Sequence, residues 1–151
     1  RVHKLPVTDD VSQQDEERWC AEQRENVLAY LAIENCPSSS VGEWPAWHVA
    51  PIISIWAVES VKHSGWVGWW AVSGDFPTDY IECGAERHPR QGLRDIGLRW
   101  KEAAKRWMAG EDVADLQLGD GTQNIASASL LAQRAEMFLE IARNDQNWTE
   151  C

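Results

Sequence analysis

The segment GWVGWWAVSGDFPTDYI, residues 65–81, decides how the rest of the chain is arranged. As an extended strand, its first half would place tryptophan or valine side chains on both faces. A strand that is apolar on both faces is covered on both sides, or on one side by a partner molecule. The preceding segment IISIWAVES, residues 52–60, is also β-branched and aromatic, and the short VKHSG between the two favours an antiparallel hairpin.

The second half of this segment predicts a chain reversal followed by a third strand. SGDFPTD carries the residues that favour turns, and DYIECG alternates apolar and polar residues, which is typical of an edge strand. We therefore expect strands near 52–59, 66–73 and 79–83. They should form an antiparallel meander with 66–73 in the middle.

Helical patterns flank these strands and complete the predicted fold. Ser12, with acidic residues in the following turn, predicts the start of a helix over 12–34. His88-Pro89 opens a second helix that ends near Gly110, and Ser127 or Ser129 starts a third. Residues 35–42, 43–51 and 111–124 are expected to be loops. The fold class is α+β, with an N-terminal helix, a three-stranded antiparallel meander and two C-terminal helices packed on the sheet. One domain at 12–148 would follow a flexible segment at 1–11.

Composition restricts the partners that the chain can have. The 151 residues carry a net charge of −10, which argues against binding to nucleic acid or to anionic membranes and permits a basic protein partner. No apolar run approaches the ~20 residues of a membrane helix. The four cysteines are dispersed, and reduced cysteines in a cytoplasmic protein are the simpler interpretation. The apolar sheet face would suit a homodimer.

Asp75 and Asp79 are the first candidates for catalysis. Two carboxylates across a turn can share a proton as a general acid and base, and His48 in the proline-rich loop could act as a base beside them. The alternative is that both aspartates accept backbone N–H bonds and stabilise the turn, which is the common role of aspartate there. We favour this structural role.

Other polar and aromatic residues provide weaker candidates for binding. Among the ten tryptophans, most of which suit core positions, Trp47 and Trp66, together with Tyr80, are the candidate binding residues. Arg87, Arg90 and Arg94 could form an anion patch at a helix start, although a solvated helix face is the preferred interpretation. The histidines and cysteines lack metal-site spacing, so we expect no metal, and no motif indicates a cofactor.

Two sequence elements resemble a known family. GEWPAWHVAPIISIWAVES and GWVGWWAVSGDFPTDYI, followed by HPRQGLRDIGLRWKE, resemble uncharacterised bacterial proteins grouped as a domain of unknown function, over roughly residues 15–145. The W-P-A-W and G-D-x-P-T-D-Y-I elements carry the resemblance. It implies a single bacterial cytoplasmic domain, and it implies no activity, cofactor or catalytic residue.

Two function classes remain open. The first is a small acidic binding or inhibitor protein without catalytic activity, such as an immunity protein, acting on a basic protein partner. The second is a small enzyme or ligand-binding protein that uses Asp75, Asp79 and His48 in a tryptophan-lined cleft. A deep pocket containing these groups would favour the enzyme, and an acidic face over a solid core would favour the binding protein.

Overall fold

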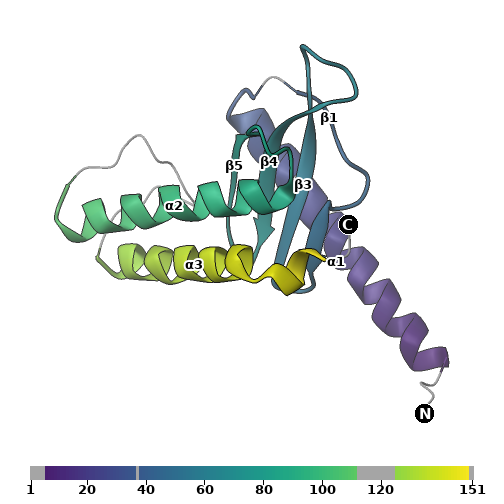
Figure 1. Cartoon of the computed structure of the whole chain (residues 1–151). Helices are drawn as coiled ribbons and strands as arrows, with labels where there is room; N and C mark the ends of the chain where they lie inside the picture. Colours follow the sequence, from purple (N-terminus) through teal and green to yellow (C-terminus); the bar gives the residue numbers. More distant parts are fainter. Residues whose placement is uncertain (1–5, 37, 112–124, 150–151) are drawn as a thin grey trace.

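Two apolar strands lie at the centre of an antiparallel sheet. The computed structural model describes residues 6–36, 38–111 and 125–149 (Figure 1). β3 (Ile53–Ser60) pairs with β4 (Val67–Gly74), and β4 pairs with β5 (Phe76–Glu82). The predicted meander with its central strand is therefore confirmed. β5 begins three residues earlier than predicted, because the chain reverses at Asp75 alone. β5 is an edge strand, and an edge strand can accommodate a proline such as Pro77.

Two short strands that the sequence analysis missed enlarge the sheet. β1 (Ser38–Val41) and β2 (Trp47–Val49) both pair antiparallel with β3, which gives five strands in the order β1-β3-β4-β5 with β2 beside β3. The prediction of three strands was wrong on this point. β1 is rich in serine and β2 has only three residues between two prolines. Neither is long enough to show a period-2 pattern, so both were assigned to loops.

α1 (Pro6–Ile33) covers one face of the sheet with its C-terminal half. Cys20, Gln23, Val27 and Leu31 are buried at helical spacing and form the stripe that packs on β3, β4 and β5. The N-terminal half projects beyond the sheet (Figure 1). The helix begins at Pro6 rather than at Ser12, so residues 6–11, which were assigned to a flexible segment, have helical backbone.

α2 (Pro89–Met108) and α3 (Ile125–Arg143) lie on the opposite face (Figure 1). His88 caps α2 as predicted, because its Nδ1 accepts the backbone N–H of Arg90 at 3.0 Å and Pro89 occupies the first helical position. α2 packs directly on β3, β4 and β5, whereas α3 packs mainly along α2. α3 reaches the sheet through Phe138, whose ring lies 4.9 Å from that of Phe76. A 3-10 helix, η1 (Asp145–Trp148), follows α3.

The central strands are buried on both faces by the chain's own helices. On the α2 side the cluster contains Trp70, Val72, Trp100 and Phe138, and on the α1 side a smaller cluster contains Trp56 and its neighbours. Any homodimer through the apolar sheet face stays a prediction, and α1 and α2 occupy the faces it would use.

A bulge in β4 corrects the predicted orientation of its first residues. The register between β3 and β4 shifts after Val58, and Gly68 becomes an extra residue on β4. A Cβ on Gly68 would lie 3.0 Å from the Cα of Ser60, so the strands approach too closely there for a side chain. As a result Val67 packs on the α2 side, and Trp66, which a regular strand would place on the same face as Trp70, is 58% exposed.

Candidate functional site

Asp79 is a buried anchor between β5 and α2. Its side chain is 5% exposed, and its Oδ2 accepts hydrogen bonds from Arg99 and from the indole Nε1 of Trp100, both at 2.7 Å. Its Oδ1 accepts the backbone N–H of Tyr80 at 2.8 Å. All these bonds hold neighbouring parts of the fold together, and this geometry favours the structural role for Asp79.

Asp75 lies in a different environment from Asp79. Its side chain is 82% exposed and its carboxylate is 3.8 Å from the guanidinium of Arg134 on α3. The turn is held instead by the backbone, because the N–H of Asp75 donates to the carbonyl of Ile52 at 3.1 Å. A Cβ on Gly74 would collide with that same carbonyl, which explains the glycine. The carboxylate of Asp75 therefore does not have the turn-stabilising bonds that the sequence analysis expected, and it does not join Asp79 in a shared site.

His48 lies on β2 and is tied to α1. Its Nε2 is 2.6 Å from Oε2 of Glu16, and the imidazole side chain is 16% exposed. The ring of Trp44 contacts it edge-on with centroids 5.3 Å apart. An ionised carboxylate accepts and does not donate hydrogen bonds, so the proton lies on Nε2. His48 thus joins α1 to β2, on the opposite side of the sheet from the Trp100 that binds Asp79.

The three candidate binding residues are also separated. Trp47 is stacked on Trp148 with ring centroids 4.6 Å apart and donates its Nε1–H to the carbonyl of Asn147 at 2.9 Å. Trp66 lies near the tip of the β3–β4 hairpin under the guanidinium of Arg87, 4.5 Å from the ring centroid. Tyr80 packs on the α1 side of the sheet. They form no common tryptophan-lined cleft.

The titrating groups near Tyr80 belong to the packing of α1. The Tyr30 and Tyr80 rings meet edge-to-face with centroids 5.9 Å apart. Burial, followed by the charge of Asp79, raises the pKa of Tyr30. Burial also raises the pKa of the Cys36 thiol and the Tyr80 hydroxyl. These shifts disfavour the charged forms, so the cluster is a poor source of a base or nucleophile.

The arginines of the predicted anion patch are each bound within the protein. Arg87 donates to the carbonyl of Val67 at 2.9 Å. Arg90 donates to the carbonyl of Ala142 and to Asp145, both at 2.5 Å, and so binds the C-terminal end of α3. Arg94 pairs with Glu86 at 2.7 Å. Its guanidinium is therefore neither a free anion-binding group nor simply a solvated side chain.

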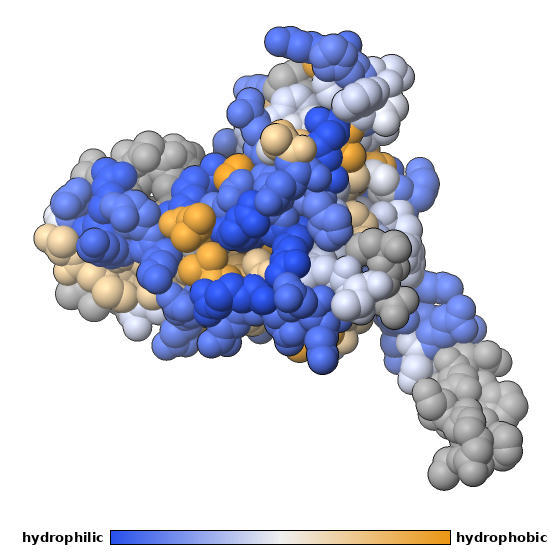
Figure 2. Space-filling model, viewed as in Figure 1, coloured by the Kyte–Doolittle hydropathy of each residue, from blue (hydrophilic) through white to orange (hydrophobic). Residues whose placement is uncertain are grey.

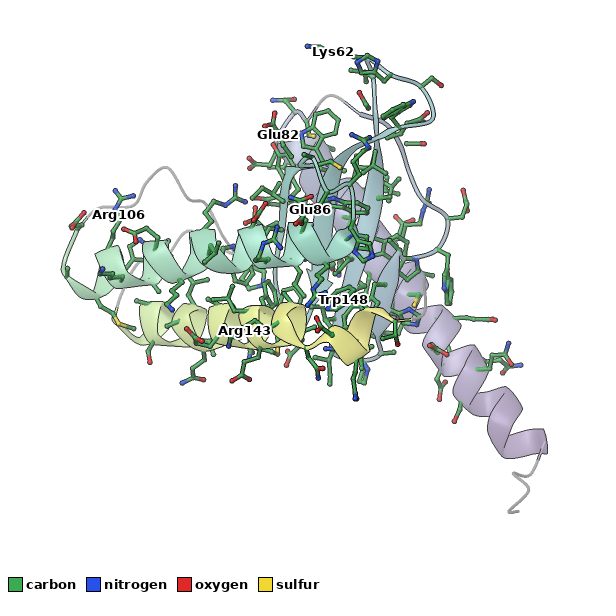
Figure 3. The ribbon with its side chains drawn as sticks, in the orientation of Figure 1. Lys62, Glu82, Glu86, Arg106, Arg143 and Trp148 are labelled. Carbon is green, nitrogen blue, oxygen red and sulfur yellow. The ribbon has the colours of Figure 1, made fainter. Side chains whose placement is uncertain are left out.

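A hollow of about 720 Å³ is lined by Arg90 and Arg94 of α2 and by the C-terminal end of α3. Figure 3 shows Glu86, Arg143 and Trp148 on this side of the molecule, and Figure 2 shows small hydrophobic areas between α2 and α3 within a hydrophilic surround. The lining includes exposed Leu98 and also Leu139. Neither aspartate candidate lines this hollow. Of its lining arginine and lysine residues, Arg90, Arg94 and Lys101 face carboxylates, and Arg143 is exposed.

A second hollow, of about 430 Å³, lies between α1 and the β2–β3 turn. Its lining contains Asp15, Glu16 and Trp19 from α1 and Pro51 from the turn. The sequence analysis did not select these residues, because the two segments lie more than thirty positions apart. The available signal was the spacing of Asp15 and Trp19, which places an acid and an aromatic ring on one helix face.

Metal-binding and membrane-spanning features are absent from the part of the chain that the structure describes. Within residues 6–36, 38–111 and 125–149, no group of three or more His, Cys, Asp or Glu side chains is placed to hold a metal ion. No helix in these ranges is both long and apolar enough to cross a membrane. Cys20, Cys36 and Cys83 are free, and Cys151 lies outside the described residues.

The family model described as "Domain of unknown function (DUF4826)" matches residues 13–148, so the chain belongs to this family. The resemblance seen in the sequence is therefore confirmed at the level of an uncharacterised family. No curated protein and no solved structure matches the chain.

Proposed function

We propose that this member of the DUF4826 family is a small acidic binding protein without catalytic activity. It would act as an inhibitor-type partner, for example an immunity protein, of a basic protein in the bacterial cytoplasm. The family brings no activity with it, so the proposal rests on charge, on the surface of α1 and on the separation of the catalytic candidates.

The observation that carries the proposal is the acidic exposed side of α1. The helix contains seven acidic and two basic residues. Glu17, Glu22 and Glu25 are exposed, and none of the ion pairs recorded within the described ranges involves them. Exposed carboxylates on the solvent side of a helix attract a basic surface at long range and accelerate its association.

The enzyme alternative receives less support from the geometry. It needs Asp75, Asp79 and His48 in one cleft. Asp79 is occupied by Arg99 and Trp100, Asp75 is exposed near α3, and His48 faces α1. Catalytic groups must lie within hydrogen-bond reach of one bound substrate. The arrangement therefore favours binding over catalysis.

Affinity capture with two charge-matched variants tests the proposal. The protein is immobilised, exposed to a lysate of its native host, and the captured proteins are identified by mass spectrometry. One triple variant reverses charges on α1: Glu17→Lys, Glu22→Lys and Glu25→Lys. The control reverses three exposed glutamates elsewhere: Glu82→Lys, Glu102→Lys and Glu140→Lys. Both triples change the net charge from −10 to −4.

The expected result is capture of a basic protein by the native chain and by the control, and loss of capture by the α1 triple. Capture should weaken as salt rises from about 0.05 M to about 0.5 M, because exposed charges are screened. Equal loss in both triples would show that only net charge matters and would contradict a role for α1. Salt-sensitive capture of nucleic acid in place of a basic protein would contradict the proposal as a whole.

A further inference from the structure

Two carboxylates and an aromatic side chain line the hollow beside α1. Its volume is about 430 Å³, and its lining residues are Ser12, Asp15, Glu16, Trp19, Ala50 and Pro51. The four helical residues are spaced i, i+3, i+4 and i+7, so they share one face of α1. That face meets the β2–β3 turn, and its two carboxylates are acidic residues of α1 other than Glu17, Glu22 and Glu25.

The carboxylate of Asp15 is available to an incoming cation. It pairs with Arg18 at 3.0 Å, and the two side chains are 63% and 66% exposed. Exposed pairs one helical turn apart contribute little free energy, so a cation from a partner can replace Arg18 at low cost.

A hydrogen bond holds the side chain of Glu16 in place. His48 donates Nε2–H to its Oε2 at 2.6 Å, and this bond fixes the direction of the carboxylate. The bond uses one carboxylate oxygen and leaves the second able to accept from another donor. Glu16 is 44% exposed, so that oxygen remains within reach from the hollow.

Apart from Ser12, the remaining lining of the hollow is aromatic and apolar. Trp19 is half-buried and lies with Ala50 and Pro51 in the lining. The neighbours of these two residues in the chain, Val49 and Ile52, are apolar and each 44% exposed. An aromatic face beside carboxylates suits a cation that carries an aliphatic stem.

We infer that this hollow receives an arginine side chain of the basic partner. The inference rests on the proposed function and locates its anchor. A guanidinium is planar, so it can stack on an indole ring while its N–H groups bind a carboxylate, which an ammonium does less well. The two carboxylates supply the charge complementarity, and Trp19 and Pro51 supply contact for the stem.

An NMR titration tests the hollow without knowledge of the partner. The probes are N-acetyl-arginine N-methylamide and the corresponding citrulline derivative, which has the same shape without the charge. The indole Nε1–H resonance of Trp19, assigned with Trp19→Phe, reports binding. We expect a saturable shift of this resonance and of the Ala50 amide with arginine, and none with citrulline.

Charge-matched variants show whether binding occurs in the hollow. Asp15→Asn with Glu16→Gln removes both charges and keeps an oxygen for His48. The control, Glu102→Gln with Glu140→Gln, also changes the net charge from −10 to −8. The first pair should weaken arginine binding by about fivefold or more, and the control by less than about twofold. Circular dichroism spectra that match the native chain show that both variants fold.

The possible outcomes separate this inference from the proposed function. Equal shifts with arginine and citrulline, or equal weakening in both double variants, would overturn the arginine site even if a basic protein is captured through α1. Arginine binding at Trp19 with no basic protein captured would overturn the proposed function, and the partner part of this inference with it. Loss of capture in Asp15→Asn/Glu16→Gln, with capture kept by its control, would support both.

Discussion

The two sides of the sheet are built differently. On the α2 side a large cluster of apolar residues, including Trp70, Trp100 and Phe138, continues through α2 into α3. On the α1 side the cluster is smaller, and a single helix covers it. The helices also differ in charge, since α1 has seven acidic and two basic residues and α2 has two acidic and six basic. Because hydrophobic burial supplies most folding free energy, the α2 side provides most of the stability, and α1 is freer to serve as a binding surface.

A series of buried hydrogen bonds joins the sheet to α1. The Nε1–H of Trp56 donates to Ser54 at 2.8 Å, and the hydroxyl of Ser54 donates to the carbonyl of Ser73 at 2.7 Å. The hydroxyl of Ser73 in turn donates to Oε1 of Gln23 on α1 at 2.6 Å. These groups are buried, and buried polar groups must be paired. The chain of bonds therefore fixes the position of α1 on the sheet.

The largest expected effect is from Asp79→Ala, which would break the junction of β5 with α2. The change leaves the buried Nε1–H of Trp100 and the backbone N–H of Tyr80 without their acceptor. Arg99 is 41% exposed, so its guanidinium can turn toward water when Asp79 is removed. We therefore expect the free energy of unfolding to fall by about 3 kcal/mol, near the lower end of the range for breaking a buried ion pair. Urea unfolding measures it. The control Asp75→Ala, at an exposed position, should change stability by less than about 0.5 kcal/mol. Equal losses in the two variants would contradict the assignment of Asp79 as the anchor.

Gly92→Ala should have the next largest effect, because it separates α2 from the sheet. A Cβ there would lie 2.6 Å from the side chain of buried Trp70. Overpacking costs about 1–3 kcal/mol, which outweighs the gain of up to ~1 kcal/mol in helix propensity. Gly97→Ala is the milder comparison, since its Cβ would lie 3.1 Å from Leu139 and 3.2 Å from the Cβ of Phe138, and it should cost less than Gly92→Ala. A stabilised Gly92→Ala protein in thermal unfolding would show that α2 packs less tightly on Trp70 than the 2.6 Å approach indicates.

Gln23→Leu tests the α1 side and should cost less, about 1–2 kcal/mol. The leucine fills the space but leaves the buried hydroxyl of Ser73 without its acceptor. The effect should be local, so amide hydrogen exchange should increase in α1 more than in α2. The exposed change Glu22→Leu on the same helix is the control. A uniform increase in exchange over all helices would mean that α1 is not a separate unit of stability.

The α2 side and the central strands were predictable from the sequence, whereas the junctions were not. The strands that are apolar on both faces, and the apolar residues of α2 from Leu93 to Trp100, show as local patterns in the sequence. Their burial follows from those patterns. β2 was missed because three residues carry no period. The structural role of Asp79 stays a prediction, and its partners could not be read from the sequence, because Arg99 and Trp100 lie about twenty residues further on and tertiary packing alone brings them together.

The same reason explains what was missed at the candidate site. His48 was selected for its chemistry, but its partner Glu16 lies on α1, 32 residues before it, and the direction in which α1 crosses the sheet cannot be read from periodicity. The flexible segment predicted for 1–11 overlaps α1, because the helical backbone begins at Pro6.

Tyr30→Phe should change the free energy of unfolding least at neutral pH, by less than about 1 kcal/mol. Its main effect should appear at high pH, where it tests the packing of the α1 side of the sheet. Burial and the charge of Asp79 raise the pKa of Tyr30 in the folded protein. The unfolded chain therefore loses this proton first, near pH 10, and the stability contributed by neutral Tyr30 is lost as pH rises from there. Because a single proton is involved, the free energy of unfolding can fall by at most about 1.4 kcal/mol per pH unit. In Tyr30→Phe neither the folded nor the unfolded state carries this proton, so this part of the pH dependence disappears. Urea unfolding at a series of pH values should thus show a shallower decline for Tyr30→Phe above about pH 10, and parallel curves between about pH 6 and about pH 8 as an internal control. Parallel curves over the whole range would mean that the hydroxyl reaches water in the folded state, and that α1 is held less closely against β5 than the contact of Tyr30 with Tyr80 indicates.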